Sequence, residues 1–104
     1  MTNGSADGLV RLEATVRGRV QGVGFRYYVL RRAVQRGLTG WVANEADGSV
    51  RCVIEGPDAA VSEIEEILRR GPAGAVVDDI SAVRMPATGA FTGFSVRSGG
   101  HTGD

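Results

Sequence analysis

The sequence predicts a single α+β domain, in which two helices cover one face of an antiparallel sheet. The length of 104 residues corresponds to one domain. Several segments alternate apolar and polar residues as strands do, and two others repeat apolar residues at helical spacing. These segments follow one another in the order β-α-β-β-α-β, with one more short strand after them.

The first two elements are a strand and a helix. Residues 9–17 place apolar side chains on one face and Arg, Glu and Thr on the other, so we expect a half-buried strand that ends at Gly18. Residues 25–36 carry apolar side chains at helical spacing, and Gly37 can end this helix as a C′ glycine. The residues between Gly18 and the helix form a loop.

A β-hairpin is predicted next. Residues 39–44 alternate as a strand does, and Asn44 is the last of them. The dipeptide Asp47-Gly48 is a strong signal for a hairpin turn. Residues 50–55 then alternate again as the returning strand. Two antiparallel neighbours are therefore expected in the sheet.

A second helix and two strands complete the domain. Pro57 stands at the tolerant first position of the helix, and Gly71-Pro72 ends it. Residues 76–85 form a fourth strand with a weaker pattern, and residues 91–97 form a short fifth. This order is the ferredoxin-like, split βαβ arrangement. Many unrelated functions use that fold, so the function has to be argued from a site.

Composition and charge exclude several classes of protein. Twelve Arg balance twelve acidic residues, and Lys is absent, so the formal charge is zero. No apolar run exceeds four residues, far short of the roughly 20 that cross a membrane. The single cysteine, Cys52, cannot form an internal disulfide, which favours a reducing, cytoplasmic location. We expect residues 9–97 to form the domain and the polar segments 1–8 and 98–104 to be flexible tails.

The loop before the first helix has the features of an anion site. It reads Gly-Arg-Val-Gln-Gly-Val-Gly-Phe-Arg over residues 18–26, and Gly22 and Gly24 allow its backbone N–H groups to converge. A helix start also presents about four unpaired N–H groups and a partial positive charge. Arg26 lies in the first turn, where the helix dipole disfavours a cation, and its planar guanidinium suits two phosphate oxygens. The alternative is a tight turn followed by a surface arginine.

Two well-known phosphate motifs do not fit this loop. A Walker P-loop requires Lys, which the chain lacks. A dinucleotide-binding fingerprint requires a third glycine, where the chain has Tyr27, and a doubly wound sheet in place of the hairpin. Neither a nucleotide-binding P-loop nor a Rossmann site is therefore expected.

Beyond the loop alone, the sequence resembles the acylphosphatase family. The resemblance rests on Val-Gln-Gly-Val-Gly-Phe-Arg at 20–26, Gly-Trp-Val-Ala-Asn at 40–44, Asp-Gly-Ser-Val at 47–50, Glu-Gly at 55–56 and Gly-Phe-Ser-Val at 93–96. It extends over about residues 9–97. Membership would imply metal-independent hydrolysis of a carboxyl–phosphate anhydride to a carboxylate and inorganic phosphate, with no cofactor.

The resemblance also implies roles for particular residues. Arg26 would hold the phosphate together with loop amides, and Asn44 would orient the attacking water. The implied phosphate cradle consists of Gln21, Gly22, Val23, Gly24 and Phe25. A neutral amide such as that of Asn44 is a poor proton acceptor, yet it can orient a water molecule. Because an acyl phosphate is already activated, its hydrolysis needs mainly the positioning of the reacting groups and neutralisation of the phosphoryl oxygens.

Two positions depart from the family pattern. Glu45 follows Asn44, where some members carry Thr, and we expect its charge to face water. In some members the terminal carboxylate, close to the last strand, supports the arginine. Here residues 98–104 continue past that point, so Arg26 must find another partner or none.

Two other functions remain open at this stage. The main alternative is a non-catalytic module that binds phosphate or carbamoyl phosphate, since this domain also occurs within larger carbamoyl-handling maturation proteins. An RNA-binding ferredoxin-like domain is the third hypothesis, but the first strand offers Arg, Glu and Thr where such domains need aromatic residues. We expect a monomer whose partner is a small acyl phosphate, without nucleic acid, membrane or metal. Cys52 is expected to fill the core and His101 to lie in the C-terminal tail.

Overall fold

The structure is a computed structural model that describes residues 8–98, which form two helices and five strands. The strands are β1 (Leu9–Arg19), β2 (Thr39–Asn44), β3 (Val50–Pro57), β4 (Val76–Pro86) and β5 (Phe94–Arg97), and the helices are α1 (Phe25–Gln35) and α2 (Asp58–Arg70). Within this part of the chain, neither helix has the length and apolar character of a membrane span. The predicted tails and His101 lie outside the described residues, apart from Gly8 and Ser98.

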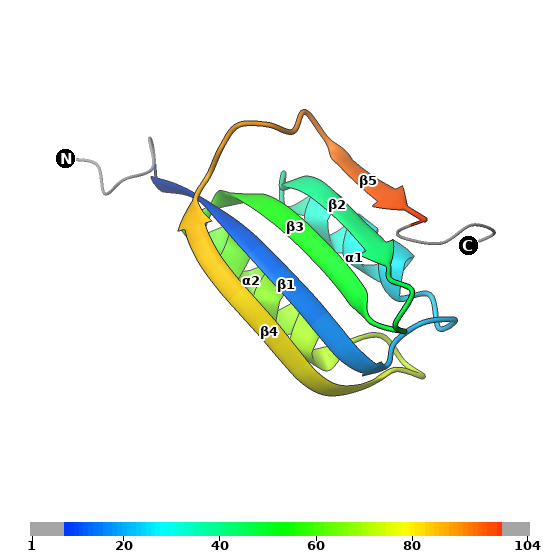
Figure 1. The fold of residues 1–104 in the computed structure, drawn as a ribbon. Helices are drawn as coiled ribbons and strands as arrows, with labels where there is room; N and C mark the ends of the chain where they lie inside the picture. Colours follow the sequence, from blue (N-terminus) through cyan, green and yellow to red (C-terminus); the bar gives the residue numbers. More distant parts are fainter. Residues whose placement is uncertain (1–7, 99–104) are drawn as a thin grey trace.

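The five described strands form one mixed sheet in the order β4-β1-β3-β2-β5 (Figure 1). Four of them pair antiparallel, as the ferredoxin-like fold predicts. The short β5 departs from the expected antiparallel sheet, because it runs parallel to β2 with Ala43 opposite Arg97. The segment between β4 and β5 makes this possible, since it crosses from one edge of the sheet to the other before β5 begins (Figure 1).

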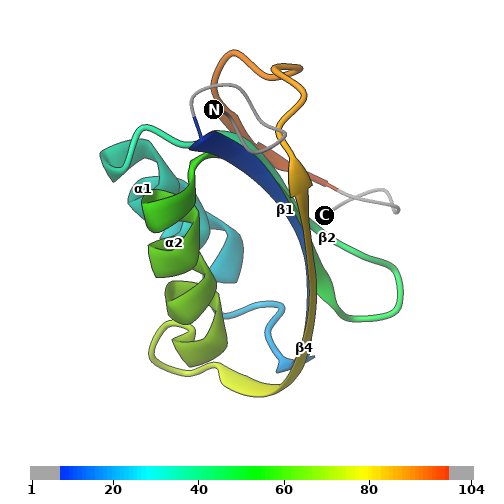
Figure 2. The same ribbon diagram turned by 90° about the vertical axis from the view of Figure 1, so that its left-hand side faces the viewer.

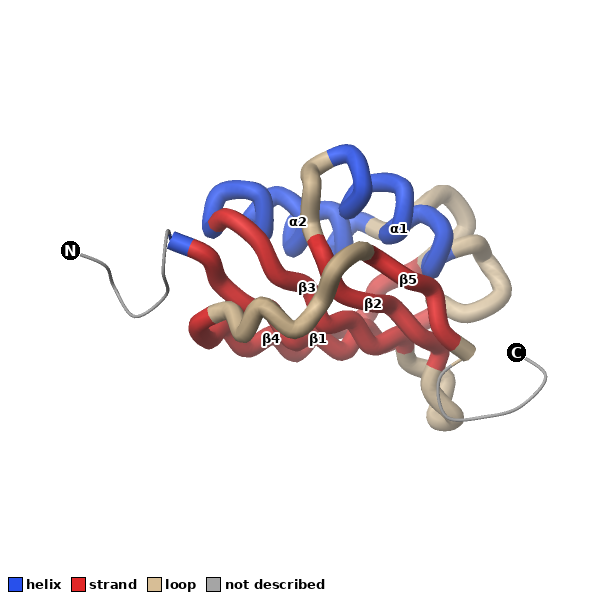
Figure 3. Tube along the Cα trace, turned by 90° about the horizontal axis from the view of Figure 1, so that it is seen from above, coloured by secondary structure: helices blue, strands red, loops and turns tan. Residues whose placement is uncertain are grey.

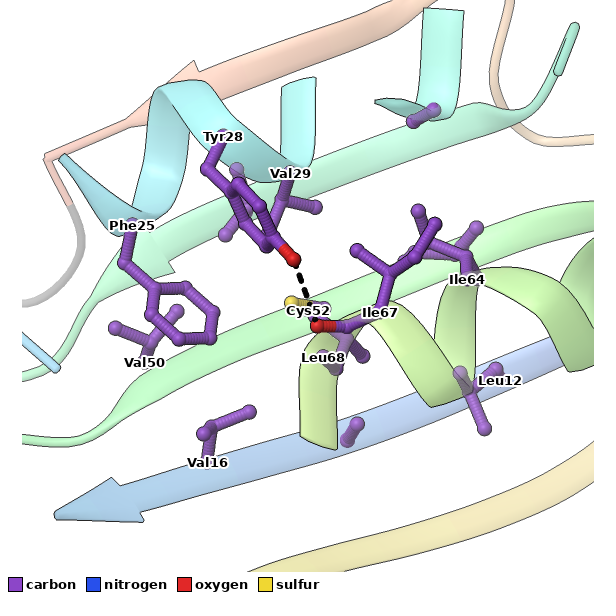
Figure 4. Close-up of a cluster of buried hydrophobic side chains, with 14 of the residues drawn as sticks. Leu12, Val16, Phe25, Tyr28, Val29, Val50, Cys52, Ile64, Ile67 and Leu68 are labelled. Atoms are coloured by element: carbon purple, nitrogen blue, oxygen red, sulfur yellow. Dashed lines mark hydrogen bonds between the residues drawn. The ribbon is translucent and has the colours of Figure 1, made fainter. Parts of the chain in front are cut away.

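Both helices lie on the same face of the sheet (Figures 2 and 3). Alternate strand residues meet the buried sides of the helices, so the core lies between the two layers. The Tyr28 hydroxyl donates a 3.3 Å hydrogen bond to the carbonyl oxygen of Ile67, which ties α1 to α2 across this core (Figure 4). The largest fully buried side chains are Phe25, Leu12, Ile54, Ile64, Leu68, Val16, Val20, Val29, Val42, Val50, Val53 and Val61.

Strand β1 extends two residues beyond its predicted last residue, Arg17. Its ladder with β4 shifts register after Arg17, and pairing then continues through Gly18 to Arg19, which lies opposite Val76. Gly18 has φ +135°, and a Cβ placed on it would lie 2.1 Å from the carbonyl oxygen of Val76. The prediction that Gly18 ends the strand is therefore wrong, because this glycine permits β4 to approach closely at a bulge.

Other boundaries also differ from the prediction, among them the starts of α2 and β5. Pro57 is the N-cap of α2 and not its first helical residue, with an extended conformation at φ −60° and ψ 143°. The last strand begins at Phe94 and not at Phe91. The ring of Phe91 instead lies beneath the Arg11 guanidinium, 5.4 Å from the centroid, so a side-chain contact holds this segment where strand pairing was expected.

Candidate active site

Three segments that are far apart in the sequence meet at one end of the sheet (Figure 1). They are the loop between β1 and α1, the turn between β2 and β3, and the C-terminal end of β5. One side chain joins the loop to the turn, and another joins the start of α1 to the end of β5. All the residues that the sequence singled out for function, at 21–26 and at Asn44, lie in this region.

The loop enters α1 through two glycines in the left-handed conformation. Gly22 has φ +77° and Gly24 has φ +80°, and apart from its chain neighbours no atom of the described residues lies within 4 Å of a Cβ built on either. Conformation, and not crowding, therefore favours glycine at both positions. Gly24 is the N-cap of α1, and in the described chain no side chain caps this helix end. The helix start thus combines backbone N–H donors with a dipole that no acidic residue in the first turn offsets.

The apolar side chains of the loop anchor it to the core. Phe25 is only 2% exposed, and its ring packs edge-on against Tyr28 with the centroids 6.0 Å apart. Val23 is partly buried against the same core. The remaining two residues of the segment 22–25 are glycines, so main-chain groups are what this segment can offer a polar ligand.

Arg26 lies in the first turn of α1 and reaches the end of β5. Its Nη1 atom donates a 3.0 Å hydrogen bond to the carbonyl oxygen of Arg97. The guanidinium of Arg97 lies over Trp41, 4.6 Å from the ring centroid, so the strand end is itself held in place. One partner of Arg26 is therefore a main-chain carbonyl at the end of the last strand.

Asn44 is the last residue of β2 and is 7% exposed. It shares a side of the strand with Val42, which belongs to the core beneath the helices. Asn44 therefore lies on the face of the sheet that carries α1. The end of β2 is at the same end of the sheet as the loop that enters α1 (Figure 1).

The side chain of Gln21 joins the loop to the turn that follows Asn44. Its Nε2 atom donates to the carbonyl oxygen of Glu45 at 2.8 Å and to that of Ser49 at 2.9 Å. The sequence predicted Gln21 only as part of the cradle and did not predict these hydrogen bonds of its side chain. No local pattern could have revealed them, because the two acceptors lie 24 and 28 residues further along the chain.

The turn between β2 and β3 is closed by hydrogen bonds of its own. The N–H of Glu45 donates to the carbonyl of Ser49 at 2.9 Å, and the N–H of Gly48 donates to the carbonyl of Glu45 at 3.1 Å. Oδ1 of Asp47 accepts bonds from the Ser49 hydroxyl at 2.6 Å and the Ser49 N–H at 2.9 Å. These two bonds hold the pKa of the Asp47 carboxyl below its usual value. The turn predicted from Asp47-Gly48 is therefore well defined.

Three other expectations concern groups near or below this site. Cys52 is fully buried, and burial raises the pKa of its thiol to about 12, which confirms that it fills the core. Glu45, whose charge was expected to face water, is half-buried. Within residues 8–98, no three His, Cys, Asp or Glu side chains gather as a metal ion would require.

Comparison with known proteins places this architecture in a family. The family model Acylphosphatase matches residues 12–96. The acylphosphatase of Moorella thermoacetica is 49% identical over 90 residues, which cover 86% of this chain and 96% of that protein. The crystal structure of the Bacillus subtilis acylphosphatase has a TM-score of 0.82 at 39% identity, over 85% of this chain and 98% of that one. A domain of T. kodakarensis HypF is also similar, with a TM-score of 0.72 at 33% identity over 84% of this chain but 12% of the larger protein.

The fold and the comparisons together define an α+β hydrolase of the ferredoxin-like class. The chain belongs to the acylphosphatase family, as the family model and the Moorella relative show. The resemblance seen in the motifs at 20–26 and 40–44 is thereby confirmed, and so is the expectation that the protein is an enzyme.

Proposed function

We propose that this protein hydrolyses acyl phosphates, with the phosphoryl group held by the backbone amides of residues 21–25 and by Arg26, and with water oriented by Asn44. The observation that carries the proposal is that the start of α1, with its two glycines and Arg26, and the end of β2, with Asn44, lie at the same end of the sheet (Figure 1). The chemistry fits such a simple site. An acyl phosphate has a good carboxylate leaving group, so positioning and charge neutralisation supply what the reaction needs.

The start of α1 suits a dianionic phosphoryl group. Backbone N–H groups beside Gly22 and Gly24 and the positive end of the helix dipole favour an anion there. Arg26 adds a full positive charge and a planar guanidinium that can donate hydrogen bonds to two phosphoryl oxygens. Its bond to the Arg97 carbonyl orients the guanidinium, which has five N–H donors in all. The positive potential therefore comes from the chain itself, and we propose that the reaction is independent of metal.

Asn44 is proposed to hold the attacking water in line with the bond that breaks. The water oxygen bonds to phosphorus while the bond from phosphorus to the acyl oxygen breaks, and the carboxylate leaves with the electron pair. One proton of the water passes to a phosphoryl oxygen, so the products are a carboxylate and dihydrogen phosphate. This route needs no side-chain base, which is why an amide is sufficient at position 44.

Hydrolysis of benzoyl phosphate tests the proposal directly. The purified protein should release inorganic phosphate catalytically, and excess EDTA should leave the rate unchanged. Loss of activity in EDTA, restored by a divalent metal, would contradict the metal-independent mechanism. Saturable binding of benzoyl phosphate or carbamoyl phosphate in calorimetry, with no release of phosphate, would instead support the non-catalytic binding module. Arg26→Ala protein, purified in the same way, controls for contaminating phosphatases.

A further inference from the structure

We infer that Gln21 is a positioning residue, whose side-chain amide sets the distance between the phosphate-binding loop and Asn44. The inference deepens the proposed function and rests on it, because it concerns the same site. Gln21 belongs to the implied cradle through its backbone, yet its side chain turns away to two main-chain carbonyls of another segment. That arrangement gives this one residue a part in both halves of the site.

Both N–H bonds of the Gln21 amide have an acceptor at short distance. The carbonyl oxygens of Glu45 and Ser49 lie 2.8 Å and 2.9 Å from Nε2, within the range of good hydrogen bonds. Each acceptor is also part of the closed turn, since the Gly48 N–H bonds to the Glu45 carbonyl and the Glu45 N–H to the Ser49 carbonyl. Gln21 therefore binds a turn that is already closed by its own hydrogen bonds.

The two acceptors lie just beyond Asn44, on the turn side of the hairpin. Asn44 pairs with Val50 at the end of the ladder, and Glu45 and Ser49 are the next residues outward from that pair. The carbonyl of Glu45 is thus one residue away from the side chain that is proposed to hold water. Gln21 is partly buried, so its bonds are partly shielded from competing solvent.

The reaction gives this link a catalytic consequence. The loop would hold the phosphoryl group and Asn44 the water, so the relative position of the loop and the turn sets the approach of water to phosphorus. A misplacement of about 1 Å can cost about 10²-fold in rate, because in-line attack tolerates little error. Losing the Gln21 amide should therefore slow the chemical step more than it weakens binding of phosphate.

Gln21→Met tests this, because methionine has a similar length and lacks both donors. We expect kcat for benzoyl phosphate to fall about 10-fold to 100-fold, while the inhibition constant of inorganic phosphate changes less than about 3-fold. Gln35→Met makes the same chemical change at an exposed position of α1 and should leave both constants unaltered. Unchanged kcat in Gln21→Met, or a loss that appears only in phosphate affinity, would overturn the inference.

A double-mutant cycle separates positioning through Asn44 from a general loosening of the fold. In protein that already carries Asn44→Ala, adding Gln21→Met should lower kcat little further, because the water it helps to place is no longer held. Losses that simply multiply would overturn the inference. Gln21→Asn provides a second variant, since it keeps the amide but shortens its reach by about 1.5 Å. We expect it to behave as Gln21→Met does.

Circular dichroism and thermal melts of each variant complete the test. If neither Gln21→Met nor Gln21→Asn folds, the contact is structural and the positioning role is wrong. If Asn44→Ala loses turnover while Gln21→Met keeps it, the inference fails and the proposed function stands. Full turnover in Asn44→Ala would overturn the proposed role of Asn44, and the inference with it.

Discussion

The guanidinium of Arg26 and the carbonyl oxygen of Arg97 lie 3.0 Å apart, and this bond joins the first turn of α1 to the end of β5. A carbonyl oxygen carries a partial negative charge, so this bond helps to orient the guanidinium. The parallel pairing of β5 with β2 puts Arg97 opposite Ala43, next to Asn44 in the chain. The short last strand, of four residues, therefore supplies a contact to one of the proposed site residues.

Replacement of Arg26 should affect binding and turnover together. Arg26→Ala removes the full positive charge beside the loop amides, and we expect kcat/KM for benzoyl phosphate to fall about 10³-fold. Arg26→Lys keeps the charge but not the planar fork, so it should recover only part of the loss. Arg31→Ala, at an exposed position of the same helix, is the matched control. Wild-type kinetics in Arg26→Ala would show that the guanidinium has no part in the reaction.

Replacement of Asn44 should mainly slow turnover. We expect Asn44→Ala to lower kcat about 10²-fold, because the amide is proposed to hold water and not the phosphoryl group. The inhibition constant of inorganic phosphate should remain close to that of the unaltered protein. Steady-state kinetics with phosphate as a competitive inhibitor measures both constants. A weaker phosphate affinity with unchanged kcat would instead assign Asn44 to binding.

The buried carboxylate of Glu55 should stabilise the fold above acidic pH. It is 4% exposed and accepts bonds from the Arg11 guanidinium, from the N–H and hydroxyl of Thr88, and from the Gly89 N–H. Burial by itself raises the pKa of this carboxyl, but the bonds from Thr88, Gly89 and Arg11 outweigh burial and hold the pKa below its usual value. The folded state thus favours ionised Glu55 more than the unfolded chain does.

Two measurements check this contribution. Glu55→Gln should lower the free energy of unfolding at pH 7 by about 2 kcal/mol. The neutral amide replaces a buried carboxylate, so the hydrogen bonds to a charged acceptor are lost. A carboxyl group whose pKa is lower in the folded state stabilises the fold fully above its pKa in the unfolded chain, about 4.3. This stabilisation disappears as the pH falls through the lower pKa of the folded state. The difference between the two proteins in urea unfolding should therefore shrink below about pH 4. Glu66→Gln, at an exposed position, should show neither effect.

Gly18 should tolerate no side chain. A Cβ there would lie 2.1 Å from the Val76 carbonyl oxygen and 2.8 Å from the Asp78 nitrogen, at φ +135°. We expect Gly18→Ala to lower the free energy of unfolding by about 3 kcal/mol, from backbone strain and overpacking together. Gly74→Ala is the control, because its φ is +92° but its Cβ would meet open space, so only the conformational cost of about 1 kcal/mol applies. Equal stability losses in the two variants would show that crowding at the β1–β4 bulge is unimportant.

Cys52 should be inert until the protein unfolds. With a thiol pKa of about 12 and a fully buried side chain, it has almost no accessible thiolate at pH 8. Iodoacetamide should therefore leave the native protein unmodified and alkylate it in guanidinium chloride, as mass spectrometry can follow. Rapid modification of the native protein would mean that the core between the sheet and the helices opens readily.

The sequence by itself determined the order of the elements, the hairpin at Asp47-Gly48 and the family. Alternation, helical spacing and turn dipeptides act within a few residues, and the motif at 20–26 lies in one continuous segment. The residues proposed to carry the reaction, Arg26 and Asn44, could be selected for the same reason, because each stands within a short recognisable motif.

Tertiary structure alone decided how these residues are held. Four features are contacts between distant segments: the parallel pairing of β5, the close approach of β4 to Gly18, the bond from Arg26 to a carbonyl, and the bonds from Gln21 to the turn. Arg26 and Arg97 are 71 residues apart, and Gln21 and Glu45 are 24 apart. Such contacts depend on how whole layers pack against each other, and no local run of residues encodes where a side chain will find an acceptor on another strand.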